Sequence, residues 1–217
     1  ASKNRNGIKG TNSNDDGSGN SLTILDIATN PAQPAVVGYI RDPVNLFGAY
    51  GVAVTGHYAF VAAQGCLTGQ PCPNAGVGDS FNVIDFSSPV SPQIVATLRN
   101  SALPAPWTGT GALSHPCSVA ISGNYAYVTA AYSNRLTVID ISNPLAPTIV
   151  ASILDKNQLD FPVDVAVAGN HAYVADQGGG LGRVATVDVS DPTHPSITGL
   201  VTNANTTLDG AYRIRVR

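Results

Sequence analysis

The segment RLTVIDISNPLAP (residues 135–147) decides the fold, because the chain contains three more versions of it. Each version has an apolar run that ends in Asp, then a short polar step and a Pro-x-x-Pro turn. The other three are SLTILDIATNPAQP (21–34), SFNVIDFSSPVSP (80–92) and RVATVDVSDPTHP (183–195). Self-similarity at a period of roughly 50 to 60 residues indicates one supersecondary unit copied along the chain.

A second motif alternates with the first. It reads GVAVTGHYAFVAA (51–63), SVAISGNYAYVTA (118–130) and DVAVAGNHAYVAD (164–176). Two β-branched and aromatic runs around a two-residue turn that begins with Gly predict a tight hairpin, since Gly adopts positive φ at no steric cost. One repeat therefore holds four short strands, which we place in the second unit at 52–55, 58–62, 81–86 and 93–98.

Four-stranded units in series predict an all-β chain folded as a β-propeller, or a segment of one, with four-stranded antiparallel blades. We expect about four blades with one incomplete. Residues 21–40 supply only the last two strands of a blade, three complete units follow, and residues 213–217 resemble a lone first strand. The chain thus divides into a flexible or exchanged N-terminal tail (1–20) and propeller repeats (21–217).

The strand missing from the incomplete blade leaves three explanations open. The chain is a piece of a longer propeller, or a neighbouring subunit donates the strand, or the N-terminal tail fills the gap. Arg213, Arg215 and Arg217 alternate, so they project to one face of the last strand. Because they replace small residues of the other units, they need partners. For the surroundings of these arginines we favour an interface with another subunit over solvent or a channel, while the three explanations of the missing strand stay open.

These motifs resemble the LVIVD repeat of secreted and cell-surface β-propeller proteins of bacteria and archaea. The resemblance rests on V-A-[VI]-x-G-[NH]-x-A-[YF]-V and on RLTVIDISNP and RVATVDVSDP, and it covers roughly residues 21–217. It implies an extracellular or cell-surface location. The family is defined by its repeat rather than by one activity, so the resemblance implies no catalytic residue and no cofactor.

Composition agrees with an exported protein, since 12% of residues are charged and Met is absent. A net charge of −3 offers no general attraction to nucleic acid. We find no apolar stretch long enough to span a bilayer and no signal peptide. The chain begins at Ala1, which we interpret as a mature product or a piece of one.

The most variable loops, at 64–80 and 100–116, are the candidate ligand face, because binding often uses variable loops on a fixed scaffold. Trp107 and His115 lie in the second of these loops, and Trp107 is a candidate for contact with a glycan or a protein. Packing within the loop is the simpler explanation for this Trp. Asn205 begins an Asn-Thr-Thr glycosylation sequon in another loop.

The three cysteines are near the same loops. In a secreted protein Cys66 and Cys72 are the easiest disulfide pair, although Cys117 could pair with either one. The cysteine left over would then be unpaired and buried. A zinc site made with His115 is a weaker interpretation, because no C-x-x-C pair is present.

No catalytic constellation emerges. One aspartate recurs in every unit, which favours a structural hydrogen bond to the following turn over four active sites; these residues are Asp26, Asp85, Asp140 and Asp188. We therefore expect a non-catalytic extracellular module without metal or cofactor. It binds another surface protein or assembles with itself, and strand sharing between subunits is one way in which it could assemble. The alternative is an enzyme or a propeller that binds a small ligand or carbohydrate on its long-loop face.

Overall fold

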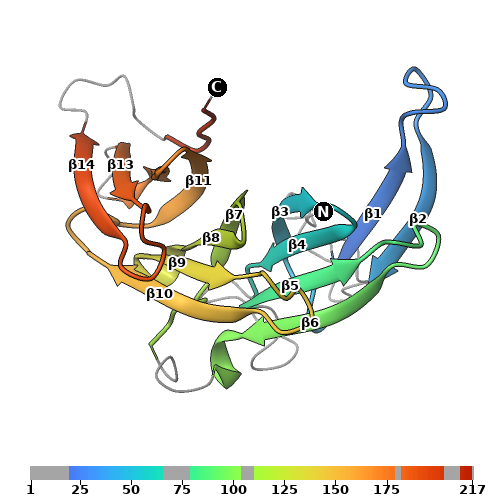
Figure 1. Ribbon diagram of the computed structural model, residues 1–217, viewed down its shortest axis with the longest axis horizontal. Coiled ribbons are helices and arrows are strands. Elements are labelled where there is room, and N and C mark those ends of the chain that lie inside the picture. Colours follow the sequence, from blue (N-terminus) through green and yellow to red (C-terminus); the bar gives the residue numbers. More distant parts are fainter. Residues whose placement is uncertain (1–19, 66–78, 104–109, 179–181, 203–210, 217) are drawn as a thin grey trace, which may run out of the picture.

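The protein is an all-β arc of four antiparallel sheets, as seen in a computed structural model (Figure 1). The structure describes residues 20–65, 79–103, 110–178, 182–202 and 211–216. Its first sheet has two strands, β1 (Ser21–Asp26) and β2 (Ala35–Arg41), and each of the other three has four. The predicted architecture of about four blades, one of them incomplete, is confirmed.

The three complete sheets follow chain order from one edge to the other. The second sheet holds β3 (Ala49–Thr55), β4 (Tyr58–Ala63), β5 (Ser80–Asp85) and β6 (Gln93–Arg99). The third holds β7 (Pro116–Ser122), β8 (Tyr125–Ala130), β9 (Arg135–Asp140) and β10 (Thr148–Leu154). The fourth holds β11 (Pro162–Ala168), β12 (His171–Asp176), β13 (Arg183–Asp188) and β14 (Ser196–Thr202).

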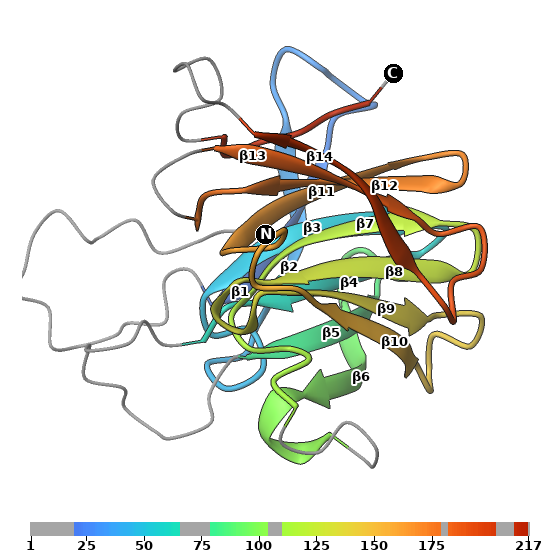
Figure 2. The same ribbon diagram turned by 90° about the vertical axis from the view of Figure 1, so that its left-hand side faces the viewer.

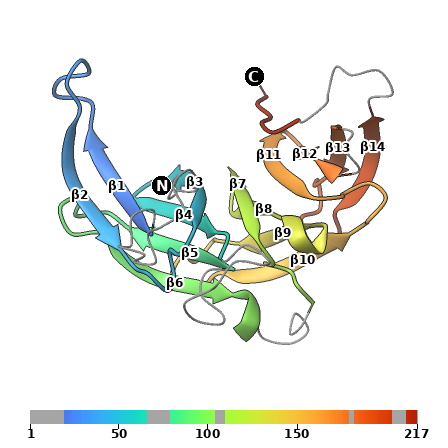
Figure 3. The same cartoon turned by 180° about the vertical axis from the view of Figure 1, so that it is seen from behind.

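Neighbouring sheets stack face to face along the arc, which Figure 2 shows from the side. The first strand of each complete sheet (β3, β7 or β11) lies toward the concave side of the arc, and the last strand lies on the convex side (Figure 3). The sheet of β1 and β2 corresponds to the last two strands of the other sheets. Its inner half is therefore not built by any described residue.

The predicted hairpin turns are confirmed by their backbone geometry. Gly56, Gly123 and Gly169 have φ values of 56°, 55° and 54°, and each opens the turn between the first two strands of its sheet. Only a residue without a Cβ reaches this region without steric cost. In each unit the second turn residue accepts a hydrogen bond from the residue after the repeated Asp, as Phe86 N donates to His57 O at 2.9 Å.

The repeated aspartates form the turn contacts expected of them. The Oδ1 atom of each one accepts the backbone N–H two residues later, at 2.7–2.8 Å, in an Asx turn. The pKa of the Asp85 carboxyl is lowered, chiefly by the hydrogen bond from the Ser87 backbone. The four residues are Asp26, Asp85, Asp140 and Asp188, and this geometry supports a structural role.

The core is divided among the interfaces between sheets. The second and third sheets enclose a cluster in which the rings of Phe60 and Phe81 stack at 5.9 Å, and which Val119 of β7 closes from the other side. Ala53 of β3 packs on this same cluster. The alternation of valine and alanine in the inner strands therefore places the large side chain toward one neighbouring sheet and the small one toward the other.

One predicted strand is wrong. Residues 211–216 do not form a β-strand, although they lie beside β11 on the concave side (Figure 1). A strand requires ladder hydrogen bonds to a neighbour. The segment is instead attached through the side chain of Asp164, which accepts the backbone N–H of Ile214 at 2.9 Å.

Candidate functional site

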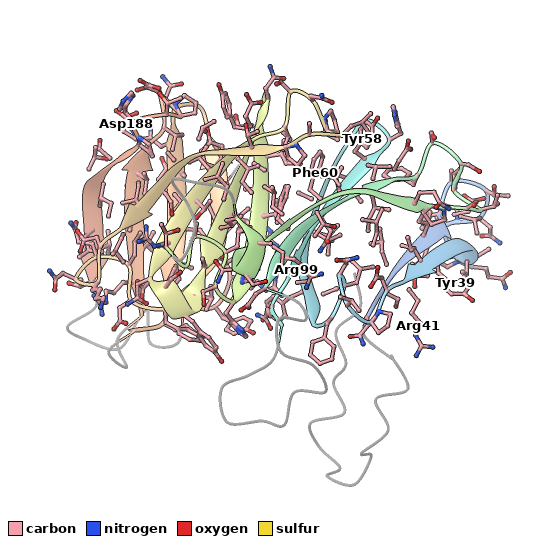
Figure 4. The ribbon with its side chains drawn as sticks, turned by 90° about the horizontal axis from the view of Figure 1, so that it is seen from below. Tyr39, Arg41, Tyr58, Phe60, Arg99 and Asp188 are labelled. Atoms are coloured by element: carbon pink, nitrogen blue, oxygen red, sulfur yellow. The ribbon has the colours of Figure 1, made fainter. Side chains whose placement is uncertain are left out.

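The two ends of the sheets form two different faces. In Figure 4, Asp188 and Tyr58 lie toward the face of the tight turns, and Arg99 and Arg41 lie toward the opposite face. The predicted ligand face is this second one. Its two variable loops do meet, because Asn100 N donates to Asp79 O at 2.8 Å and His115 N donates to Asp79 Oδ1 at 2.9 Å.

His115 is buried at this face, with 4% of its surface exposed. Its ring stacks on Tyr132, with centroids 4.0 Å apart and planes at 7°, and Phe161 lies 6.5 Å away. Its Nδ1 atom lies 3.0 Å from the Gln64 carbonyl. Through Gln64, Tyr132 and Phe161, His115 thus contacts segments that belong to the second, third and fourth sheets. The role in ligand binding that we expect for His115 stays a prediction.

His115 also has an unusual backbone conformation. Gly48, His115 and Phe161 occupy the same position in successive units, just before the first strand, and have φ values of 68°, 55° and 66°. In each unit the carbonyl of this residue accepts an N–H from the segment that follows the second strand. Two units thus place a ring where the turn favours Gly, and these rings pack against each other around Tyr132.

The remaining predicted residues of the loops have different outcomes. Cys117 is buried beneath this face, where its sulfur lies 3.2 Å from Gln64 Nε2. Five other predicted residues lie outside the described ranges; they are Cys66, Cys72, Trp107, Asn205 and Arg217. The proposed disulfide, the aromatic ligand contact, the glycosylation site and the interface role of Arg217 therefore stay predictions. Within the described ranges no cluster of three His, Cys, Asp or Glu side chains could hold a metal ion.

A groove of about 500 Å³ runs along the concave side of the arc, over the inner strands β3, β7 and β11. Its floor is made of small and branched apolar side chains. Polar groups gather at one end of it, where the C-terminal segment crosses; they are Tyr50, Ser118, Asp164, Arg213 and Arg215. We call this end of the groove, defined by these five residues, the axial polar cluster.

Asp164 organises the axial polar cluster. Its side chain is 3% exposed, so its charge requires strong partners. Ser118 Oγ donates to Asp164 Oδ1 at 2.5 Å, while Asp164 Oδ2 accepts from Ile214 N at 2.9 Å and from an Arg215 N–H at 3.0 Å. Three donors thus stabilise one buried carboxylate, and the charge of Arg215 neutralises it.

Arg213 lies at the exposed rim of the same cluster. Its guanidinium carbon is 5.8 Å from the ring centroid of Tyr50 and 5.7 Å from that of Tyr212, within the range of cation–π attraction. The two tyrosine rings meet edge to face at 6.5 Å. The aromatic pair restricts the position of Arg213, and no carboxylate of the described residues forms an ion pair with it.

The sequence predicted these two arginines but not their surroundings. Gly51, Ser118, Asp164 and Arg213 share one position in successive repeats, and their different chemical types give no repeated signal of a polar cluster. The inner strands in fact converge at this position. A Cβ on Gly51 would lie 2.5 Å from Cys117 O, so the glycine is required by close approach of β7. The missed signal was a charged pair, Asp164 and Arg215, one repeat apart.

A second, apolar cavity of about 250 Å³ lies between β1 and β3. Its described lining is Leu22, Thr23, Ile24, Val52, Val54, Ala59 and Phe86, and we call it the β1 notch. Val52 and Val54 are 40% and 57% exposed here, whereas Val119 and Val165, which occupy the position of Val52 in later units, are 7% and 3% exposed. The notch is the place where other sheets have their two inner strands.

The described residues contain no helix that is both long enough and apolar enough to cross a membrane. Among curated proteins none matches the chain. Solved structures share its fold at low identity. One is a protein from Lactobacillus plantarum, with 16% identity, a TM-score of 0.63, and coverage of 85% of this chain and 50% of that one.

Two further structures of similar fold have more specific descriptions. A candidate 6-phosphogluconolactonase from Bacteroides uniformis has 13% identity and a TM-score of 0.63, covering 88% of this chain and 52% of its own. A hypothetical selenium-binding protein from Sulfolobus tokodaii has 13% identity and a TM-score of 0.60, covering 85% and 47%. The chain thus spans about half the length of the solved propellers that it matches, and this likeness shows the fold alone.

The family comparison is more specific than the likeness in fold. The LVIVD repeat matches residues 17–42, 48–68, 115–155 and 163–203, which together are more than half of the chain. These segments contain the hairpin motif and the Asp-containing motif that the structure places in one sheet. The chain belongs to the LVIVD-repeat family.

Proposed function

We propose that this protein is a non-catalytic extracellular module that assembles with a second copy of itself by strand sharing at the β1 notch. The observation that carries the proposal is the exposure of Val52 and Val54 of β3, which border the cavity beside the unfinished sheet of β1 and β2. In the later units the counterparts of Val52 are buried and those of Val54, Ile121 and Val167, are half-buried. An exposed apolar strand edge is a template for pairing with another chain.

The two ends of the arc are complementary. β1 and β2 supply the outer strands of a sheet, and residues 211–216 occupy the place of an inner strand beside β11. In one molecule they lie at opposite ends of the arc (Figure 3). A contact between the C-terminal segment of one copy and the β1 notch of another would bring both parts into a single sheet. The low charge, the absence of Met and the family support an extracellular location.

The test is the oligomeric state of the chain over a concentration series, measured by light scattering after size exclusion. We expect dimers or larger assemblies, and we expect Val54→Lys to shift them toward monomer, because a buried Lys without a partner opposes strand docking. Leu145→Lys is the matched control, since Leu145 is 58% exposed in a turn and Val54 is 57% exposed.

Two results would overturn the proposal. One is a wild-type chain that remains monomeric up to its solubility limit. The other is an assembly that responds equally to Val54→Lys and Leu145→Lys, because the contact would then lie elsewhere. Far-UV circular dichroism of both variants establishes that a shift to monomer does not come from unfolding.

A further inference from the structure

The axial polar cluster has a charge that docking of the C-terminal segment at the apolar β1 notch does not explain. It holds two arginines and one aspartate, and the aspartate is already neutralised by Arg215 at 3.0 Å. Arg213 forms no ion pair within the described residues. The cluster thus carries an excess positive charge inside a groove, in a chain whose net charge is −3.

The two guanidinium groups are held in place by different means. Arg215 is fixed by Asp164, which is itself fixed by Ser118 and by the Ile214 backbone. Arg213 is fixed by the rings of Tyr50 and Tyr212. Arg has five N–H donors in a planar fork, and the hydrogen bonds of Arg215 to Asp164 and to the Ile214 carbonyl both come from a single nitrogen, Nη1. Donors therefore remain available on both arginines.

Pre-positioned guanidinium groups in a groove suit an oxyanion. Arg binds carboxylate and phosphate groups through paired hydrogen bonds, and these charge-assisted bonds are stronger than neutral ones. The Tyr50 ring next to Arg213 adds an apolar surface of the kind on which a sugar ring can pack. The groove volume of about 500 Å³ is in the range of small-molecule sites.

From this arrangement we infer that the axial polar cluster binds a small polar ligand through its carboxylate or phosphate group. Arg213 is the principal contact, Arg215 is a second contact, and Asp164 positions Arg215. Tyr50 lies beside the remainder of the ligand. The apolar floor of the groove, formed by β3, β7 and β11, excludes water on one side and thereby strengthens the charge contacts.

The experiment is isothermal titration calorimetry of the whole chain with three probes, glucuronate, methyl phosphate and glucose. We expect at least one of the two anions to bind and glucose not to bind. Arg213→Gln should weaken anion binding about tenfold to a hundredfold, which is the loss expected for a charge-assisted hydrogen bond. Arg41→Gln removes an arginine from β2, outside the lining of the groove, and should leave the affinity unchanged.

Each outcome bears on the inference. Preference for glucuronate or for methyl phosphate supports it and identifies the oxyanion. Binding of neither anion, binding of glucose as tight as that of the anions, or equal effects of Arg213→Gln and Arg41→Gln would overturn it. Because Arg213 is exposed and takes no part in the Asp164 contacts, its variant should fold, and the thermal midpoint of each variant checks this.

Discussion

The Ser118 hydroxyl donates to the buried Asp164 carboxylate at 2.5 Å, and this contact joins β7 to β11, the inner strands of adjacent sheets. The inner strands are where neighbouring sheets approach most closely. A hydrogen bond to a charged, buried acceptor at this point stabilises the spacing of the sheets. The same carboxylate also holds the C-terminal segment, so one side chain connects three parts of the arc.

We therefore expect Ser118→Ala to destabilise the fold by about 1–3 kcal/mol, because it leaves one oxygen of a buried carboxylate without a donor. The measurement is the free energy of unfolding in urea. Ser122→Ala, at the far end of β7, is the control, since removal of a partly exposed hydroxyl should change stability by less than about 0.5 kcal/mol. Equal losses in both variants would contradict a special role for the Ser118–Asp164 contact.

Much of the fold could be predicted because it depends on short-range patterns. The glycine of each hairpin and the aspartate of each turn act within two or three residues, so their roles follow directly from the sequence. The repeat then multiplies one local prediction over the whole chain. The predicted strand 93–98 differs from β6 (Gln93–Arg99) by a single residue.

The candidate site could not be predicted, because its contacts join residues far apart in the chain. Asp164 and Arg215 are 51 positions apart, and nothing local to either one indicates the other. Arg213 corresponds to Gly51, Ser118 and Asp164 of the earlier inner strands, which led to a predicted strand at 213–217. A strand forms only beside a pairing partner, and the described residues supply none to this segment.

Gly38 provides a test of the packing between the first two sheets. It lies in β2, and a Cβ at this position would meet the Pro89 carbonyl oxygen at 1.9 Å, which is a backbone atom of the next sheet's turn. We expect Gly38→Ala to cost about 1–3 kcal/mol through overpacking. Thermal unfolding of the variant measures the loss.

Gly199 is the matched control for Gly38, because it has the corresponding position in β14. Its added Cβ would meet only the Thr186 side chain, with Cβ at 3.5 Å and Oγ1 at 3.6 Å, which are ordinary contact distances. Gly199→Ala should be neutral or slightly stabilising, since alanine reduces the entropy of the unfolded chain. A Gly38→Ala variant as stable as Gly199→Ala would show that β2 does not pack against the turn at Pro89.

Asp79 should make the stability depend on pH. Burial raises the pKa of its carboxyl above the ordinary 3.8, while the hydrogen bond from the His115 backbone opposes the shift. Because the folded pKa exceeds the unfolded one, the folded state binds more protons between the two values. Stability from this group is therefore full below about 3.8 and declines as the pH rises through the folded pKa.

Asp79→Asn removes the charge and keeps an oxygen that can accept the His115 N–H at 2.9 Å. We expect the variant to be more stable than wild type at pH 7 and equally stable at pH 3.5, when melting temperatures are compared across the range. A difference in melting temperature that stays constant with pH would show that the Asp79 charge is not the cause. Asp191→Asn serves as the control of opposite sign, because local hydrogen bonds in an exposed turn lower the pKa of Asp191 to about 2. Loss of this charge should give no gain in stability at pH 7.

Asp140 allows the repeated turn contact to be separated from the charge of the residue. Its Oδ1 atom accepts the Ser142 N–H at 2.8 Å, in the turn that precedes Pro144. Asp140→Asn keeps an acceptor in the same place, whereas Asp140→Ala removes it, and both variants lose the charge. We expect the Ala variant to unfold about 0.5–1.5 kcal/mol more easily than the Asn variant, which is the net value of one such hydrogen bond. If urea unfolding gives equal stabilities, the aspartate recurs in each unit for a reason other than this turn, and a role at the molecular surface becomes the better explanation.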